Sequence, residues 1–262
     1  MKKWFLIVFL NCFWGSFAQN EVVPFFKNTE KWSDGTFVNR DHFGNLYGIF
    51  GNEFRKIAPN STLFYKNVAL GKISRADLQN PLQIVLFYRN FTSVVLLDNQ
   101  LNESLRINFS ELETPLNPDA VGLAAQNRLW VFDLLTQKLG LYDLRKKSFV
   151  PLTPTFTEPL VFYQTEYNYF YWMDAKQRLY AADIFGKTAS LGEIPVGKMY
   201  QVVNGKRVLY ANDQGLFVFN LENGSISKVL EVEKSFDGFT YQDEILSIFT
   251  NQEIKNYNIN LP

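Results

Sequence analysis

The sequence predicts an all-β protein assembled from one strand-rich unit that is repeated six times. In each copy an aromatic, apolar strand runs into a short polar turn and then into a second strand. The copies begin at Asn45, Leu82, Arg128, Tyr169, Arg207 and Glu244, with spacings of 37, 46, 41, 38 and 37 residues. Repeats of about 40 residues that contain several strands and no helix are typical of β-propeller blades. We therefore expect one six-bladed β-propeller made of four-stranded antiparallel blades.

The fifth copy shows the four strands of a blade most clearly. They read KMYQVVNG, RVLYAND, GLFVFNL and SISKVLEV, and turns rich in Gly, Asn and Asp separate them. Those residues adopt tight-turn dihedral angles at little cost. The sixth copy has only three strands, so we expect Glu21–Lys27 to complete the last blade and close the ring. Pro24 is compatible with an outer strand, where a missing N–H is tolerated.

The N-terminus has the pattern of a Sec signal peptide. Lys2 and Lys3 precede an apolar run, and Ser16 and Ala18 resemble a cleavage site. We expect residues 1–19 to be the signal peptide and residues 20–262 to form the propeller in the periplasm, at the outer membrane or outside the cell.

Membrane attachment is the alternative for the same segment. Cys12 follows the apolar run and could be acylated as in a lipoprotein, but Asn11 stands where a small residue is usual. The apolar run is shorter than the roughly 20 residues that span a bilayer, and no later segment reaches that length. No transmembrane segment is therefore expected.

Composition argues against several classes of function. Without Lys2 and Lys3 the 26 basic residues fall to 24 against 26 acidic ones, a net charge of −2. A chain without a basic block gives no electrostatic reason to bind nucleic acid. Cys12 is the only cysteine and His42 the only histidine, and no D-x-D-x-D run occurs, so we expect no metal and no cofactor.

Two phrases resemble known propellers. RDHFGNLY, at Arg40–Tyr47, resembles the turn-and-strand phrase of NHL-type six-bladed propellers, and LYANDQGLFVFNLENGSI, at Leu209–Ile226, is similar to the repeats of sensor-type and quinoprotein-like propellers. The leader and the abundance of Phe, Tyr and Asn resemble uncharacterised secreted propeller proteins of the Bacteroidetes. The resemblance implies the fold and export, and it carries over no activity. The tryptophan docking motif of quinoprotein dehydrogenases is missing, which disfavours a quinone cofactor.

Few side chains suggest catalysis. His42 is interpreted as a hairpin residue in the turn DHFGN, and it could act in a triad only if a serine approached it from another blade. Asp133, Asp174 and Asp213 fall in the same position of successive blades, which is typical of residues that cap a turn. An active site usually takes its acids from unlike positions.

Two long connections and one aromatic residue are the candidate binding elements. The connections are Asn108–Asp119 and Pro151–Pro159, and prolines stiffen both. The candidate residues for a partner or ligand are Glu111, Glu113, Leu116, Asp119, Phe156, Glu158 and Tyr167. Leu116 and Phe156 are expected to be anchors if exposed, and Tyr167 a stacking platform for a sugar or peptide.

The sequence leaves three functions open, of which the last is a small-ligand sensor. The first is an exported, non-catalytic scaffold in the cell envelope that binds a protein or a glycan. The second is a carboxylate-dependent polysaccharide hydrolase or lyase with its site at the channel mouth, for which two acids from different blades would have to converge.

Overall fold

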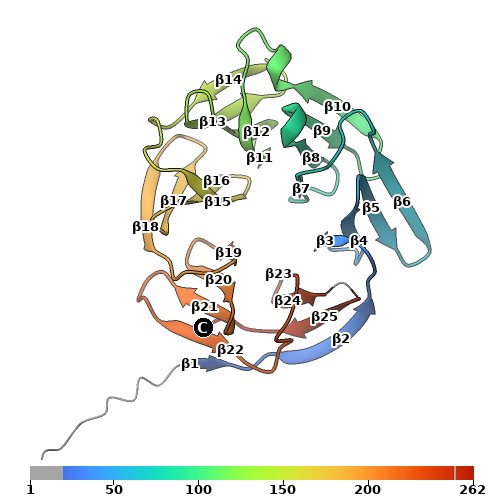
Figure 1. The fold of residues 1–262 in the computed structure, drawn as a ribbon, viewed down its shortest axis with the longest axis vertical. Helices are drawn as coiled ribbons and strands as arrows, with labels where there is room; N and C mark the ends of the chain where they lie inside the picture. Colours follow the sequence, from blue (N-terminus) through green and yellow to red (C-terminus); the bar gives the residue numbers. More distant parts are fainter. Residues whose placement is uncertain (1–19, 251) are drawn as a thin grey trace, which may run out of the picture.

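The structure is a computed structural model that describes residues 20–250 and 252–262. Six sheets surround a central channel, and the first strand of each blade lies nearest to it (Figure 1). This confirms the predicted all-β, six-bladed propeller with four-stranded antiparallel blades. The predicted signal peptide, with Cys12, lies outside the described residues.

The blades follow one another along the chain. The strands of the first three blades are β3 (Thr36–Arg40), β4 (Leu46–Phe50), β5 (Glu53–Ala58) and β6 (Ser61–Lys66); β7 (Arg75–Asp77), β8 (Ile84–Tyr88), β9 (Ser93–Leu97) and β10 (Glu103–Asn108); and β11 (Pro118–Ala124), β12 (Arg128–Asp133), β13 (Lys138–Asp143) and β14 (Ser148–Pro151). Blades four and five contain β15 (Leu160–Thr165), β16 (Tyr169–Asp174), β17 (Arg178–Asp183) and β18 (Thr188–Glu193), then β19 (Met199–Val203), β20 (Arg207–Asn212), β21 (Gly215–Asn220) and β22 (Ile226–Val229). The sixth contains β23 (Gly238–Gln242), β24 (Ile245–Phe249) and β25 (Glu253–Asn258). Two short 3-10 turns, η1 (Arg89–Phe91) and η2 (Phe109–Glu111), flank the second blade's outer strands.

The N-terminal segment closes the ring, as predicted, but it does so in two pieces. Strand β2 (Phe25–Lys31) pairs antiparallel with β25 and is the outer strand of the sixth blade. Strand β1 (Asn20–Val22) pairs in parallel with β22 and adds a fifth strand to the fifth blade. The predicted closing segment, Glu21–Lys27, is therefore displaced by several residues, and buried Pro24 joins the two strands instead of lying within one.

The hydrophobic core is divided into six layers, one at each junction between neighbouring blades. Between the third and fourth blades, for example, Trp130 and Phe132 pack with Phe170 and Trp172. Tyr171, between the latter two in sequence, belongs to the layer between the fourth and fifth blades. This alternation follows from the two-residue period of a strand whose faces both contact another blade.

Polar side chains join the innermost strands of adjacent blades. The Gln164 amide accepts from the Val202 N–H and donates to the Val202 carbonyl, both at 2.8 Å. Gln201 makes the same pair with Tyr241, both at 2.7 Å. Asp77 accepts from the Leu123 N–H at 2.8 Å, and Gln79 donates to the Leu123 carbonyl at 3.1 Å. These amide and carboxylate groups therefore satisfy backbone groups that line the channel.

A second set of bonds joins β7 directly to β15, across the blade between them. Arg75 donates to the Tyr163 carbonyl at 3.2 Å, Thr165 to Asp77 at 3.0 Å and Tyr167 to the Gln79 carbonyl at 3.4 Å. Each bond joins residues 88 apart. Strand β11 is therefore set back behind this bridge, and Gly122 lies against Thr165.

Candidate functional site

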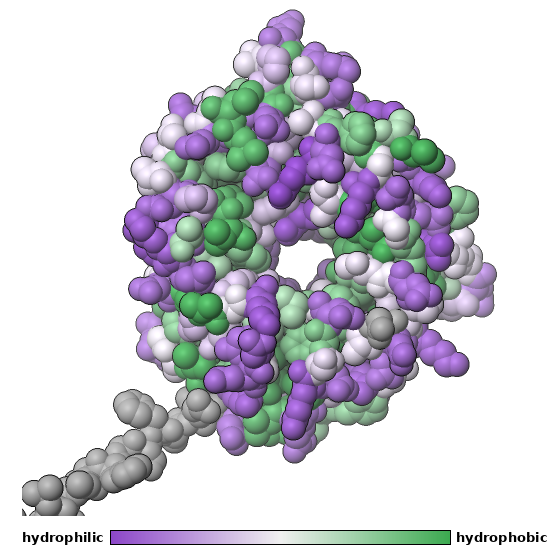
Figure 2. Space-filling view, in the orientation of Figure 1, coloured by the Kyte–Doolittle hydropathy of each residue, from purple (hydrophilic) through white to green (hydrophobic). Residues whose placement is uncertain are grey.

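A cavity of about 350 Å³ occupies the end of the channel at which the innermost strands finish. Its walls come from β3, β7, β15, β19 and β23 and from the turns that follow the first three of them. Figure 2 shows the channel open through the ring, with hydrophilic residues along much of its rim. The cavity residues with ionisable side chains are Arg40, Asp41, His42, Arg75, Asp77 and Glu166.

Two of the three carboxylates in this cavity accept hydrogen bonds that stabilise the fold. Asp41 accepts from the N–H groups of Phe43 and Asn45, from the Asn45 amide and from the Tyr47 hydroxyl. Burial would raise the pKa of Asp41, but these hydrogen bonds outweigh it and lower the pKa. Asp77 accepts four hydrogen bonds, all from uncharged donors. Both groups therefore hold a turn or a blade junction in place.

Glu166 is the third carboxylate of this cavity and the one available for a catalytic role. It follows β15 directly, its side chain is half-buried, and it makes no ion pair with any residue that the structure describes. Burial raises its pKa, and contact with the Gln164 amide offsets only part of this effect. A carboxyl group with a raised pKa in a polar cavity is suited to act as a general acid.

The raised pKa leads to a prediction for stability. Below the ordinary value of 4.5 Glu166 is protonated in both the folded and the unfolded chain, so its burial costs little. As the pH rises, the unfolded chain loses this proton more readily, and folding stability falls. Glu166→Gln is therefore expected to raise the melting temperature at pH 7 to 8 and to leave it unchanged near pH 4. Thermal unfolding across this pH range tests this, with Glu111→Gln on an exposed turn as the control. A lower melting temperature for Glu166→Gln at pH 7 would mean that the ionised group is stabilised instead.

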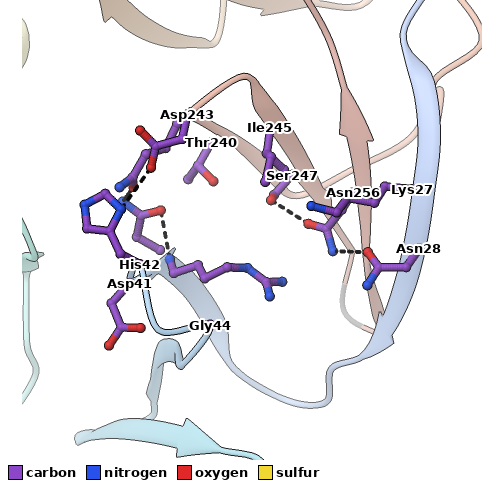
Figure 3. A pocket seen from close by; sticks show the side chains of 13 residues that line it. Lys27, Asn28, Asp41, His42, Gly44, Thr240, Asp243, Ile245, Ser247 and Asn256 are labelled. Atoms are coloured by element: carbon purple, nitrogen blue, oxygen red, sulfur yellow. Dashed lines mark hydrogen bonds and ion pairs between the residues drawn. The ribbon is translucent and has the colours of Figure 1, made fainter.

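The single histidine lies at the edge of the same cavity. His42 is in the turn between β3 and β4, as the sequence predicted, and is largely exposed. Its Nδ1 lies 3.1 Å from Oδ2 of Asp243, which comes from the turn after β23, and the two side chains face each other in Figure 3. The Asp41 carboxylate points away from the imidazole ring of His42. Asp243, from another blade, therefore orients the imidazole, in place of its sequence neighbour.

A second cavity, of about 290 Å³, continues from His42 into the gap between the first and sixth blades (Figure 3). Asn39, Arg40, Asp41, His42 and Gln242 line both cavities, so the two form one recess. Its only serine, Ser247, donates to Asn256 at 2.6 Å and is buried. No serine in the described lining is placed as a nucleophile beside His42, which disfavours a triad.

The predicted binding residues lie at two ends of the channel. The connection before β15 and the Glu166 turn after it are separated by the length of a six-residue strand, about 20 Å. Tyr167 lies at the cavity end, where it contacts Gln79. The other six lie before or at the start of β11, or before β15, and so at the opposite end: Glu111, Glu113, Leu116, Asp119, Phe156 and Glu158.

Several of these six already have partners. Leu116 is 4% exposed in the core between the second and third blades, so the exposure that an anchor role requires is not met at this position. Phe156 is half-buried and stacks between Phe132 and Trp172. Asp119 pairs with Arg89 and Glu158 with Lys176. A binding role for Glu111, Glu113 and the rest of this group stays a prediction.

Two of the three repeated acids are turn residues that accept hydrogen bonds from backbone N–H groups. Asp133 accepts from the N–H of Asn117 and Thr136, and Asp174 from the N–H of Lys176 and Arg178. In the fifth blade Asn212 takes this position and accepts from Gln214, whereas Asp213 is exposed beside Lys198. These acids are not aimed at the cavity described above.

Sequence reasoning missed Arg75, Glu166 and Asp243. Each belongs to a different blade, and only closure of the ring brings them to one recess. One signal was present in the sequence: Gln164 and Gln201 are 37 residues apart, a repeat length, on the innermost strands of successive blades. Within the described residues no cluster of three metal-binding side chains occurs. No helix in the same part of the chain is long and apolar enough to cross a membrane.

The fold and the recess define a six-bladed β-propeller with a polar cavity at one channel mouth. No protein-family model matches the chain, and no curated protein matches it. Similar solved structures include virginiamycin B lyase from Staphylococcus aureus, in a catalytically inactive histidine-to-alanine variant with quinupristin, at 9% identity and a TM-score of 0.58. That match covers 90% of this chain and 100% of the other. They also include PorZ of Porphyromonas gingivalis, a surface component of the type-IX secretion system, at 11% identity and a TM-score of 0.52, covering 88% of this chain and 31% of that one.

The comparisons correct one expectation from the sequence. The prediction of a non-catalytic scaffold is wrong, because the solved structures that resemble this chain include a lyase that covers nearly all of it. The fold therefore gives no argument against catalysis.

Proposed function

We propose that the protein is a lyase whose active site is the recess at the mouth of the channel. The observation that carries the proposal is the joint placement of two different titratable groups. The His42–Asp243 pair and the half-buried Glu166 line one connected recess. A histidine and one carboxyl group of raised pKa in the same recess fit elimination better than glycoside hydrolysis, which needs two carboxylates facing each other across the bond.

In this mechanism His42 is the base and Glu166 the acid. The imidazole, held by Asp243, takes a proton from a carbon next to an electron-withdrawing group. The electron pair of that C–H bond forms a carbon–carbon double bond, and the bond from the neighbouring carbon to a leaving oxygen breaks. Glu166, whose pKa is raised by burial, gives its proton to that oxygen. No water is consumed, and proton exchange with solvent restores both groups.

The test is a search for the double bond that elimination creates. The protein is incubated with quinupristin and with a set of acidic polysaccharides, and ultraviolet absorbance reports the unsaturated product. His42→Ala and Glu166→Gln are each expected to lower kcat by about 10²- to 10⁴-fold. Glu193→Gln, at the exposed end of the outer strand β18, is expected to keep the activity. Absence of product from every substrate, or an unchanged rate in His42→Ala, would refute the proposal.

We also propose that the protein works outside the cytoplasm. The charged, apolar and small-residue regions of residues 1–19 support this, and so does the resemblance of the leader and of the Phe, Tyr and Asn content to secreted propeller proteins of the Bacteroidetes. The likeness to PorZ, a bacterial surface component, is compatible with it. Cell fractionation of the tagged chain, with and without residues 2–19, tests the location.

A further inference from the structure

The recess contains a guanidinium group that has no carboxylate partner. Arg40 and Arg75 both line it, and Arg40 is paired with Glu30. Arg75 has no described carboxylate within ion-pair distance. Its neighbour Asp77, two residues on, accepts only from uncharged donors. A charge left unpaired and half-buried is costly unless something else occupies its donors.

The position of Arg75 is fixed by its surroundings. Its guanidinium stacks on the ring of Tyr163, 4.1 Å from the ring centre, and one nitrogen donates to the Tyr163 carbonyl at 3.2 Å. These contacts hold the planar group against the fourth blade and use one of its N–H groups. A guanidinium has five N–H donors in a rigid fork. The remaining donors are therefore preorganised for a ligand in the cavity, at little further cost in side-chain entropy.

The rest of the lining suggests a hydroxylated ligand. Gln242 accepts from Asn39 at 3.0 Å through its oxygen, which leaves its amide N–H groups for another acceptor. Most residues of this lining are polar or charged. The volume of about 350 Å³ is at the low end for ligand sites, which fits one or a few sugar rings.

We propose that the recess binds a sugar acid, with Arg75 holding the carboxylate through paired hydrogen bonds. A carboxylate matches the fork of a guanidinium, and such paired bonds are stronger than those to neutral groups. This inference deepens the proposed function and rests on it for the role of the site. The carboxylate would be the electron-withdrawing group next to the carbon that loses its proton, and Arg75 would stabilise the negative charge that develops on it. The predicted substrate class is a polysaccharide that contains uronic acids.

Binding can be tested apart from catalysis. The probes are tri-galacturonate and its fully methyl-esterified form, which differ in carboxylate charge, titrated calorimetrically into the full chain. The acid is expected to bind at least tenfold more tightly than the ester. Added salt is expected to weaken the binding of the acid and to leave the binding of the ester unchanged. Arg75→Gln is expected to abolish the preference, and Arg75→Lys to keep part of it because charge remains without the fork. Arg89→Gln, at an exposed ion pair, is the control and is expected to bind like the wild type.

The outcomes separate this inference from the proposed function. Equal binding of acid and ester by the wild-type protein, binding of neither, or an unchanged preference in Arg75→Gln would overturn the inference. An acetylated tripeptide with a free carboxylate that binds as tightly as the sugar acid would overturn the sugar assignment. If the acid preference is found and depends on Arg75 while no elimination product forms, the inference stands and the proposed function fails. Arg75 also bridges two blades, so its replacement can affect folding. If Arg75→Gln does not fold, the comparison of acid and ester binding by the wild-type protein still tests the inference.

Discussion

Replacing Asp77 by alanine is expected to lower the free energy of unfolding by about 3 kcal/mol or more. The carboxylate is 8% exposed and accepts from the Leu123 N–H on β11 and the Thr165 hydroxyl on β15, as well as from Gln79. One side chain therefore holds three blades together. Its removal leaves these buried donors without partners, and each orphaned donor costs roughly 1–3 kcal/mol. Unfolding in urea, followed by tryptophan fluorescence, measures the loss.

Two further variants show whether the loss comes from the junction between blades. Asp77→Asn keeps the shape but replaces one acceptor oxygen by an amide donor, so an intermediate loss is expected. Asp98→Ala is the matched control, because Asp98 makes a similar turn with Gln100 and Asn102 on the outside of a single blade. If Asp77→Ala were no more damaging than Asp98→Ala, the three-blade contact would carry no stability.

The repeat in the sequence was sufficient to predict the blades, because each blade is a local structure. Strands β19 to β22 follow one another with short turns, and the alternation of apolar residues fixes their faces. The closing strand was also predicted, because a sixth copy with three strands needs a fourth. The exact pairing of the N-terminal segment was not predicted, because strand β1 pairs in parallel with β22 over only three residues. So short a pairing leaves no pattern in the sequence. A parallel edge pairing depends on where the ring brings the N-terminus.

The site could not be predicted in the same way, because its residues meet only across the ring. Asp243 reaches His42 from the sixth blade, and Arg75 reaches Tyr163 over the third. Asp41 is adjacent to His42 in the sequence, but the turn uses the Asp41 oxygens for its own N–H groups. A carboxylate in a tight turn is more often consumed locally than aimed at its neighbour. Nothing in the sequence pointed to Glu166, because its raised pKa comes from burial in the folded chain.

Replacing Gly122 by alanine is expected to lower the free energy of unfolding by about 3 kcal/mol. A Cβ atom at this position would lie 2.1 Å from Oγ1 and 2.6 Å from Cβ of Thr165. Rotation of the Thr165 side chain does not relieve the contact with its Cβ, so β11 and β15 must move apart. For a chain of this size the loss corresponds to a fall in melting temperature of about 6–12 °C, which circular dichroism would detect. Gly122→Val is expected to prevent folding, whereas Ala189→Val on the exposed strand β18 adds similar bulk and is expected to be tolerated.

The double variant Asp77→Ala with Gly122→Ala shows whether both residues act through Thr165. Asp77 holds the Thr165 hydroxyl at 3.0 Å, and Gly122 makes the room into which Thr165 fits. Once Asp77 is removed, Thr165 is free to withdraw from a Cβ at position 122. The combined loss is therefore expected to be smaller than the sum of the two single losses, by about 1 kcal/mol, since residues that share a partner are coupled. Strict additivity would mean that the hydrogen bond to Asp77 does not hold Thr165 against β11, and that the bridge from β7 to β15 does not set β11 back from the channel.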